Sequence, residues 1–387
     1  MASGYVERRG KSWRIVIEAG RKPDGSRNRI FKTMSGVTKK EAEAEMHRIA
    51  NELTTGVYVE PSKLTLSEYL DQWLENHSKT RLSPMSAFRY KKEIENRIKP
   101  VIGHIRLEHL TPLAIQSFVD EIEKAGWLKS DKPLSAEMIT YDLKIIKRAL
   151  KQAVKWGLIP RNPASDIAAP QATKNKEMNI LTEEQIKNLL STLKTGKDFQ
   201  KYVLILLLVS TGLRLGEALA LTWDDIDFEP ENEVILVNKT IQRVDGEILI
   251  KPPKTESSNR KVTIDPILAA ALKRHSTKQK ERRLMLGSKW KGKGNHVFTG
   301  PTGGLTVNST IENWWIQFRK QNGLEGIRLH DMRHTHATHL LASGKIDIKT
   351  IAQRLGHKNA AMTLNIYSHV LPAKEREAAK VMSYLWQ

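Results

Sequence analysis

The stretch Thr211-Gly-Leu-Arg-Leu-Gly-Glu217 closely follows the longest apolar run of the chain, Tyr202 to Val209. The run predicts a buried helix, and the turn after it is expected to deliver Arg214 into a pocket. A planar guanidinium there can contact two oxygens of one phosphate group. Glu217, one helical turn later, is expected to orient an arginine by pairing with it; the alternative is an ordinary ion pair along a helix.

Residues further along the chain complete a set suited to phosphate chemistry. His330 and Arg333 stand three apart in His330-Asp-Met-Arg333 and share one face of a predicted helix, His357 ends Arg-Leu-Gly-His, and Tyr367 follows ten residues later. Phosphoryl transfer spreads negative charge over non-bridging oxygens, so fixed positive charges and donors stabilise its transition state. A tyrosine hydroxyl can attack phosphorus and hold the strand covalently. The sequence therefore predicts a phosphodiester-cutting site.

These residues, in this order and with these neighbours, resemble the tyrosine recombinase (phage integrase) family, in its longer form with an N-terminal arm-site DNA-binding domain. The resemblance covers almost the whole chain. It implies that Arg214 and Arg333 are the two catalytic arginines, that His357 donates to the phosphate, and that Tyr367 is the nucleophile. His330 is the candidate general base, or a second donor to the phosphate.

Lys254 is the remaining catalytic candidate. It stands in the polar turn Pro252 to Asn259, where the family carries a mobile catalytic lysine, and it can protonate the departing 5′ oxygen as a general acid. Lys251 and Lys261 are rivals for the role. Lys254 is preferred because it lies at the tip of the turn rather than inside a predicted strand.

Histidines at helical spacing raise the question of a metal. His334, His336 and His339 follow His330, and such a cluster can bind zinc. The chain has no His-Glu-x-x-His signature and no cysteine, so no metal ligand set is evident. We expect no metal and no cofactor, and the resemblance implies none, because the covalent bond to tyrosine conserves the energy for rejoining.

Composition points to nucleic acid. The 387 residues carry 63 Lys and Arg against 43 Asp and Glu, a net charge of +20. Such a charge is expected of a protein that meets a polyanion, with duplex DNA the leading candidate and a membrane surface the rival. The apolar runs are too short to span a bilayer and no signal peptide is visible, so a cytoplasmic location in a bacterial host, without membrane association, is expected. The absence of cysteine excludes disulfides and a thiol nucleophile.

Residues 1–62 predict a small basic domain. Trp13, Ile15 and Ile17 alternate with polar or smaller residues, and Asp24-Gly25 is a turn before a second extended run, so we expect a three-stranded sheet. Thr38-Lys-Lys-Glu41 is a capping box that opens a covering helix. A basic sheet can enter the major groove. The alternative is a solvated basic sheet; the candidate DNA contacts are Arg14, Arg27, Arg29 and Lys32.

Residues 63–165 predict a helical domain. A second capping box begins at Thr65, and the periodicity indicates helices near 66–76, 84–98, 112–125 and 135–156. The resemblance makes this part the core-site DNA-binding domain. Residues 166–178 lack periodicity and are predicted to be a linker. Candidate DNA contacts on the last helix are Lys144, Lys147, Arg148 and Lys151.

Residues 179–387 are predicted to form the catalytic domain. A helix begins after Thr182, short strands are expected at 233–240, 247–251 and 260–264, and helices resume at 266. The fold class is therefore mainly α with small β-sheets (α+β), with a small antiparallel sheet in a mostly helical catalytic domain. The tail 372–387 carries an apolar stripe; in the family such a helix often docks on a neighbouring protomer, and docking on its own domain is the alternative.

The residues and the resemblance together predict a site-specific recombinase that integrates and excises a prophage or integrative element. The resemblance implies a 3′-phosphotyrosyl intermediate, a Holliday junction, and a tetramer on paired core-type and arm-type sites in double-stranded DNA. The resemblance is also compatible with two further partners, a DNA-bending host factor and an excision directionality factor. Two alternatives stay open: a topoisomerase-like or resolvase strand-transfer enzyme, and a DNA-binding regulator with a vestigial pocket.

Overall fold

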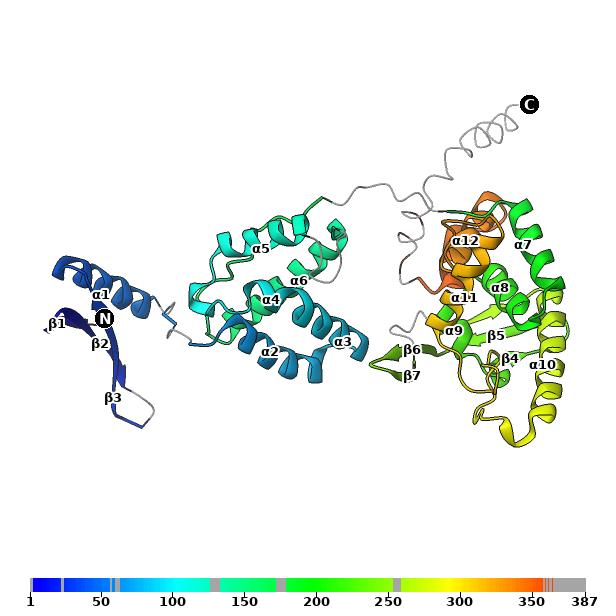
Figure 1. Cartoon of the computed structure of the whole chain (residues 1–387), viewed down its shortest axis with the longest axis horizontal. Coiled ribbons are helices and arrows are strands. Elements are labelled where there is room, and N and C mark those ends of the chain that lie inside the picture. Colours follow the sequence, from blue (N-terminus) through cyan, green and yellow to red (C-terminus); the bar gives the residue numbers. More distant parts are fainter. Residues whose placement is uncertain are drawn as a thin grey trace, which may run out of the picture. The chain divides into compact units, whose positions relative to one another are not determined.

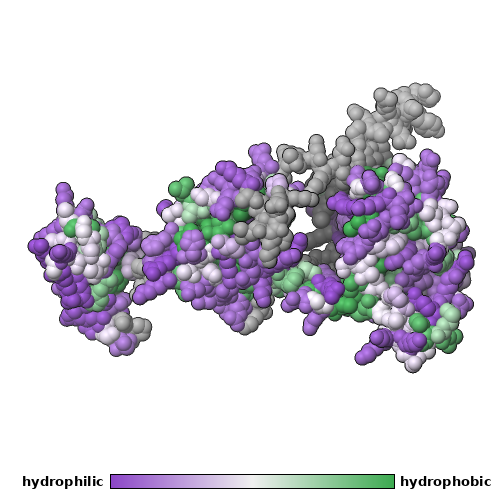
Figure 2. All heavy atoms as spheres, viewed as in Figure 1, coloured by the Kyte–Doolittle hydropathy of each residue, from purple (hydrophilic) through white to green (hydrophobic). Residues whose placement is uncertain are grey.

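A computed structural model of the chain describes residues 3–21, 24–55, 58–59, 63–125, 133–171, 179–252, 259–357, 359, 361 and 364. The chain divides into two compact units, residues 1–174 and 175–387, coloured from blue to green and from green to orange in Figure 1. The visible face of each unit is mostly hydrophilic, with smaller apolar patches (Figure 2). Lys254, Tyr367 and the predicted tail helix at 372–387 lie outside the described residues.

The first unit begins with the predicted three-stranded sheet. Strands β1 (Ser3–Arg9), β2 (Ser12–Arg21) and β3 (Arg27–Ser35) pair antiparallel in that order, and helix α1 (Lys39–Thr54) starts at the predicted capping box. Ile15 and Ile17 point from β2 toward Met46 and Ile49 of α1 and form a small apolar core with them. Because side chains alternate along a strand, Arg14, Val16 and Glu18 occupy the opposite, open face of the sheet.

Helices make up the rest of the first unit. They are α2 (Leu66–Arg81), α3 (Pro84–Glu93), α4 (Lys99–Ile102), α5 (Pro112–Ala125) and α6 (Ala136–Lys155), with a π-turn (Ile94–Ile98) and a 3₁₀ turn (Leu107–His109). One apolar core joins them. The buried guanidinium of Arg97 donates to Asp142 of α6 and to Glu93, so a buried ion pair fixes α6 against the π-turn.

The helix predicted at 84–98 continues in the structure to Ile102. The sequence argues for an end before Pro100, since proline lacks an amide donor and its ring clashes with the preceding turn. The chain instead widens into the π-turn directly before Lys99 and Pro100, and the helical path goes on as α4. A π-helix is rare and occurs mostly as a single widened turn inside an α-helix, as it does here.

Helix α8 (Phe199–Thr211) is the centre of the second unit, with every residue from Tyr202 to Leu208 buried. Helices α7 (Glu183–Thr195), α10 (Pro266–Leu286) and α12 (Asp331–Ala342) pack on it. Further elements are α9 (Leu215–Ala220), α11 (Asn308–Gln321), α13 (Ile348–Leu355), and 3₁₀ turns at Trp223–Asp225 and Gly287–Lys289. None of the described helices is long and apolar enough to cross a membrane.

Two small antiparallel sheets lie in the described part of this unit. One contains β4 (Ile226–Asp227), β5 (Val234–Val237) and β8 (Arg260–Thr263), and the other is the hairpin of β6 (Thr240–Val244) and β7 (Glu247–Lys251). The single strand predicted at 233–240 is therefore wrong, because it divides between the two sheets. Lys239 marks the break: its ammonium turns to Asp225, at 2.7 Å, and to Thr222, at 3.1 Å.

Candidate active site

Arg214 stands at the junction of two helices. Helix α8 ends at Gly212, which adopts a left-handed conformation with φ of 67°, and Arg214 caps the start of α9. One guanidinium nitrogen, Nη1, donates to Glu217 Oε1 at 2.8 Å, and the Arg214 amide donates to Glu217 Oε2 at 3.0 Å. The Arg214 side chain is 40 % exposed. The predicted turn thus holds a guanidinium at the surface of the unit with its base anchored by Glu217.

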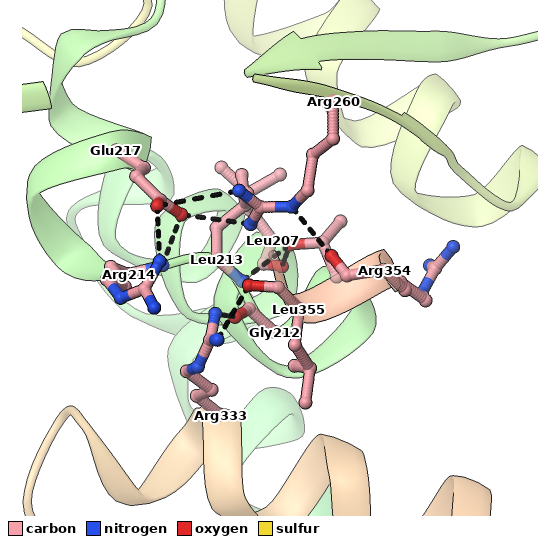
Figure 3. Close-up of polar contacts among 10 residues, drawn as sticks. Leu207, Gly212, Leu213, Arg214, Glu217, Arg260, Arg333, Arg354 and Leu355 are labelled. Atoms are coloured by element: carbon pink, nitrogen blue, oxygen red, sulfur yellow. Dashed lines mark hydrogen bonds and ion pairs between the residues drawn. The ribbon is translucent and has the colours of Figure 1, made fainter. Parts of the chain in front are cut away.

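Glu217 is shared by two arginines. It is 4 % exposed and accepts from Arg214 and from Arg260 Nη2, at 3.0 Å (Figure 3). Burial alone would raise the pKa of Glu217, but Arg260 and Arg214 hold that pKa below its usual value. The carboxylate is therefore ionised and serves as a bridge between the two guanidinium groups.

Arg333 joins two turns of the chain from its place on α12. Its Nη1 donates to the Gly212 carbonyl at 2.8 Å, and its Nη2 donates to the Leu355 carbonyl at 2.6 Å. The side chain is buried. These bonds fix the turn before Arg214 and the turn before His357 to the same guanidinium, as Figure 3 shows.

His330 and His357 complete the group around the two arginines. His330 precedes α12, and its ring packs edge-on against His334, with 4.9 Å between the centroids. Burial lowers the pKa of His330 to about 4, and the charges of Arg333 and Arg214 act in the same direction. Burial also lowers the pKa of His357 to about 4, again with Arg333 and Arg214 as neighbours. Both rings are neutral at physiological pH and can accept or donate a proton.

The other histidines of α12 bind the backbone. His336 Nδ1 contacts the Val209 carbonyl at 2.8 Å, and His339 Nε2 contacts the Leu181 carbonyl at 2.8 Å. Within the described ranges, no three His, Asp or Glu side chains converge as metal ligands would. His336 and His339 therefore tie α12 to the chain segments on either side of it.

Sequence reasoning missed two arginines of this site. Arg260, at the start of β8, binds Glu217 and donates from Nε to the Arg354 carbonyl at 2.7 Å. Arg354 donates to the Ser210 and Thr263 carbonyls, each at 3.0 Å, and to His336 Nε2 at 3.2 Å. The signal for Arg260 was Glu217 itself, because a carboxylate delivered by a buried helix needs compensating positive charge.

A hollow adjoins the site. It has a volume of about 250 Å³ and lies between Arg214 and His330. Residues of β6 and α11 line its other walls, among them Gln242, Asn308 and Glu312. The hollow gives a ligand access to the exposed side of Arg214.

The candidate DNA contacts of the sheet lie on different faces. Arg14 is on the open face, with its guanidinium carbon 4.3 Å from the centre of the Phe31 ring. Arg29 and Arg27 contact Glu18 at 2.9 and 4.0 Å. Lys32 is on the helix side, where its ammonium binds Glu45 of α1 at 2.6 Å. Arg14 also contacts Glu7, at 3.5 Å, so Arg14 and Lys32 each have a carboxylate partner and differ in the face of the sheet that they occupy.

The candidates on α6 also divide. Lys147 donates to the Ser165 and Ile167 carbonyls, and Arg148 donates to the Tyr90 hydroxyl. Lys144, Arg148 and Lys151 are exposed, and Lys147 is half-buried. Lys147 therefore holds the segment after α6, and the three exposed residues are the better placed for a ligand.

Residues 179–374 match the phage integrase family, and residues 65–122 match the N-terminal SAM-like domain of phage integrases. A tyrosine recombinase XerC-like protein of Caldanaerobacter subterraneus subsp. tengcongensis is 29 % identical over 407 residues, covering 99 % of each chain. The integrase of Staphylococcus phage L54a is 27 % identical over 362 residues, covering 87 % of this chain and 98 % of its own.

Solved structures share the fold. The Tn1549 transposon integrase bound to a circular intermediate DNA matches with a TM-score of 0.65 at 22 % identity, covering 82 % of this chain and 100 % of that one. A lambda integrase dimer bound to a core site matches with a TM-score of 0.54 at 18 % identity and 94 % coverage of both chains. The predicted fold class, mainly helical with small antiparallel sheets, is confirmed.

Proposed function

The chain belongs to the phage integrase family and is a tyrosine-type site-specific DNA recombinase, and from this premise we propose that Tyr367 is the nucleophile that cuts and rejoins the DNA of a mobile element. The roles are assigned because Arg214, Arg333, His330 and His357 lie close together. They come from three separate parts of the sequence, and Arg214 and Arg333 are electrostatic neighbours of both histidines.

Cleavage begins at the scissile phosphate. The Tyr367 oxygen bonds phosphorus while its proton passes to neutral His330, and the bond from phosphorus to the 5′ oxygen breaks. Lys254 gives its proton to the departing 5′ oxygen. The products are a 3′-phosphotyrosyl link and a free 5′-hydroxyl. The low pKa of His330 supports its role as acceptor, because the ring is unprotonated at physiological pH.

The arginines and His357 stabilise charge on the phosphate. Arg214 presents an exposed guanidinium, and a planar fork of donors suits two non-bridging oxygens. Arg333 contributes fixed positive charge from its buried position, and neutral His357 donates one hydrogen bond. Glu217 holds Arg214 in place by accepting a hydrogen bond from its guanidinium.

Rejoining reverses the same chemistry. The free 5′-hydroxyl of a partner strand attacks the phosphotyrosyl phosphorus, a new 3′–5′ phosphodiester forms, and the Tyr367 oxygen leaves and recovers a proton. One such exchange gives a Holliday junction, and a second exchange resolves it. The bond energy is conserved throughout in the covalent link, so no external energy source enters the cycle.

The substrate is double-stranded DNA carrying attachment sites, and the active assembly is a tetramer on two paired sites. The net charge of +20 and the exposed basic residues of α6 and of the sheet support DNA binding. Among the structural relatives, lambda integrase was solved as a dimer on a core site and as a tetramer on a Holliday junction. The mobile element is a prophage or a transposon-like element, as in the relatives from Staphylococcus phage L54a and transposon Tn916.

A suicide substrate tests the chemistry. The protein is incubated, in a chelator, with a candidate attachment site nicked next to the scissile phosphate, so that the released fragment diffuses away and the covalent complex accumulates. Wild type is expected to give a protein–DNA band that survives denaturing electrophoresis. Tyr367→Phe is expected to give none, and Tyr202→Phe, which alters a core tyrosine of α8, is expected to behave as wild type. Tight binding of the nicked DNA without any covalent band contradicts the proposal.

A further inference from the structure

We propose that Arg260 is a positioning residue of this active site, a role that rests on the recombinase function proposed above. Arg260 holds Arg214 through Glu217 and holds the turn before His357 through the Arg354 carbonyl. The sequence singled out neither contact, because Arg260 lies at the start of a short strand, far from both motifs.

Arg260 faces the protein rather than a ligand. Its side chain is 6 % exposed, against 40 % for Arg214. Its Nη2 contacts Glu217 Oε2 at 3.0 Å, and its Nε donates to the Arg354 carbonyl at 2.7 Å (Figure 3). An arginine engaged in this way shapes the groups around it and does not itself hold the scissile phosphate.

Arg260 also affects the charge that Arg214 presents. Glu217 is a buried carboxylate that lies between two guanidinium groups, so neither arginine is fully neutralised by it. Without Arg260, Arg214 alone compensates the buried charge. A buried carboxylate left with one partner is costly, and it draws that partner toward itself. Arg214 then turns inward, and less positive charge reaches the phosphate.

Arg260 also lies against the turn before His357. Gly356, the residue before His357, has φ of 67°, and a Cβ added there would lie 2.9 Å from Arg260 Nη1. The missing side chain makes room for the guanidinium. The glycine of Arg354-Leu-Gly-His357 is thus explained twice, by its left-handed backbone and by the close approach of Arg260.

The test separates binding from chemistry. Wild type and Arg260→Met are compared for DNA dissociation constant and for the single-turnover rate of covalent complex formation at saturating suicide substrate. We expect the rate to fall by about 100-fold, the effect of a displaced catalytic group. The dissociation constant is expected to change by less than about threefold, because uniform substrate binding does not depend on Arg260. Arg260→Lys, which keeps the charge, is expected to recover part of the rate.

Two further variants distinguish positioning from general packing. Arg282→Met removes a partly buried arginine that binds Thr299 and the Gly300 carbonyl, and it is expected to react at the wild-type rate. Adding Glu217→Gln to Arg260→Met removes the uncompensated charge that pulls on Arg214. The double variant is expected to react faster than Arg260→Met alone, whereas a purely structural role for Arg260 makes it slower.

The outcomes are distinct. If wild type forms no covalent complex, the proposed function and this inference fall together. If wild type forms the complex and Arg260→Met reacts equally fast, or if Glu217→Gln slows it further, only the role of Arg260 is overturned. If Arg260→Met does not fold, Arg260→Gln replaces it; being uncharged it is expected to lose the rate as well, and a wild-type rate in that variant contradicts the inference.

Discussion

At the scale of single residues, His336 shows how the site depends on one protonation state. A backbone carbonyl only accepts and a guanidinium only donates, so His336 must carry its proton on Nδ1, toward Val209, and offer a bare Nε2 to Arg354. Burial lowers the pKa of His336 to about 4. Protonation would set two donors against each other at Nε2 and break the link between α12 and Arg354.

The pH dependence of stability follows from this pKa. Since the unfolded chain takes up a proton near pH 6.5 and folded His336 only near 4, the stability that His336 contributes is present above pH 6.5 and lost as the pH falls toward 4. Between pH 7 and pH 5 the loss is about 2 kcal/mol. His336→Gln can keep both hydrogen bonds and does not titrate. Between pH 7 and pH 5, the stability of this variant is therefore expected to fall by about 2 kcal/mol less than that of wild type. Urea unfolding of both proteins at the two pH values measures the difference; equal losses would contradict the assignment.

At the scale of elements, local sequence patterns predicted most of the fold. Capping boxes located the starts of α1, α2 and α7, and alternation located the N-terminal sheet with Ile15 and Ile17 on its helix side. The apolar run before Arg214 became the buried α8. These features depend on residues within a few positions of each other, so they can be predicted from a single sequence.

Long-range polar contacts could not be predicted in the same way. Arg333 binds the Gly212 and Leu355 carbonyls, and Arg260 binds Glu217, across tens of residues and without any periodicity. The break between β5 and β6 likewise depends on the distant partner Asp225 of Lys239. A lysine on a helix face looks the same in sequence whether it is exposed, like Lys151, or bound to a following loop, like Lys147.

The end of α8 offers a test of how tightly the elements around the site are packed. Gly212 and Gly323 have almost the same left-handed φ, 67° and 66°, but a Cβ at Gly212 would lie 2.7 Å from both His336 and Leu355, and a Cβ at Gly323 meets nothing within 4 Å. Gly323→Ala is expected to cost only the backbone strain, about 1–2 kcal/mol. Gly212→Ala is expected to cost more and to slow cleavage, because it displaces the carbonyl that Arg333 binds.

Chemical denaturation and the suicide-substrate rate are measured on both variants. The contrast between two glycines of equal conformation isolates the effect of packing from the effect of backbone strain. Equal stability losses, with cleavage unaffected in both variants, would mean that the helices around Arg333 shift to accommodate the added methyl group.

At the scale of the whole molecule, the chain must hold DNA with one set of residues and cut it with another. The residues proposed to be catalytic belong to the second unit, and the basic sheet belongs to the first. The net charge of +20 favours contact with phosphates anywhere on the duplex, so binding is expected to weaken as salt rises. Specific recognition needs a surface with more than charge, and the open face of the sheet offers one.

That face joins an arginine to exposed aromatic rings. Arg14 lies over Phe31, and Phe31 and Tyr5 are each 53 % exposed on strands that flank β2. We expect Arg14→Ala to weaken binding to arm-type DNA and to leave cleavage of a substrate with only a core-type site unchanged, because that reaction is proposed to use the helical part of the first unit together with the second unit, and not the sheet. Lys32→Ala removes the same charge from the same sheet, but Lys32 is bound to Glu45 on the helix side, so arm-type binding is expected to persist.

Fluorescence anisotropy with the two DNA classes and the suicide-substrate assay separate these effects. Equal losses from both variants would show that net charge, and not the open face, governs arm-type binding; a slower core-site cleavage in Arg14→Ala would show that the two tasks are not separable.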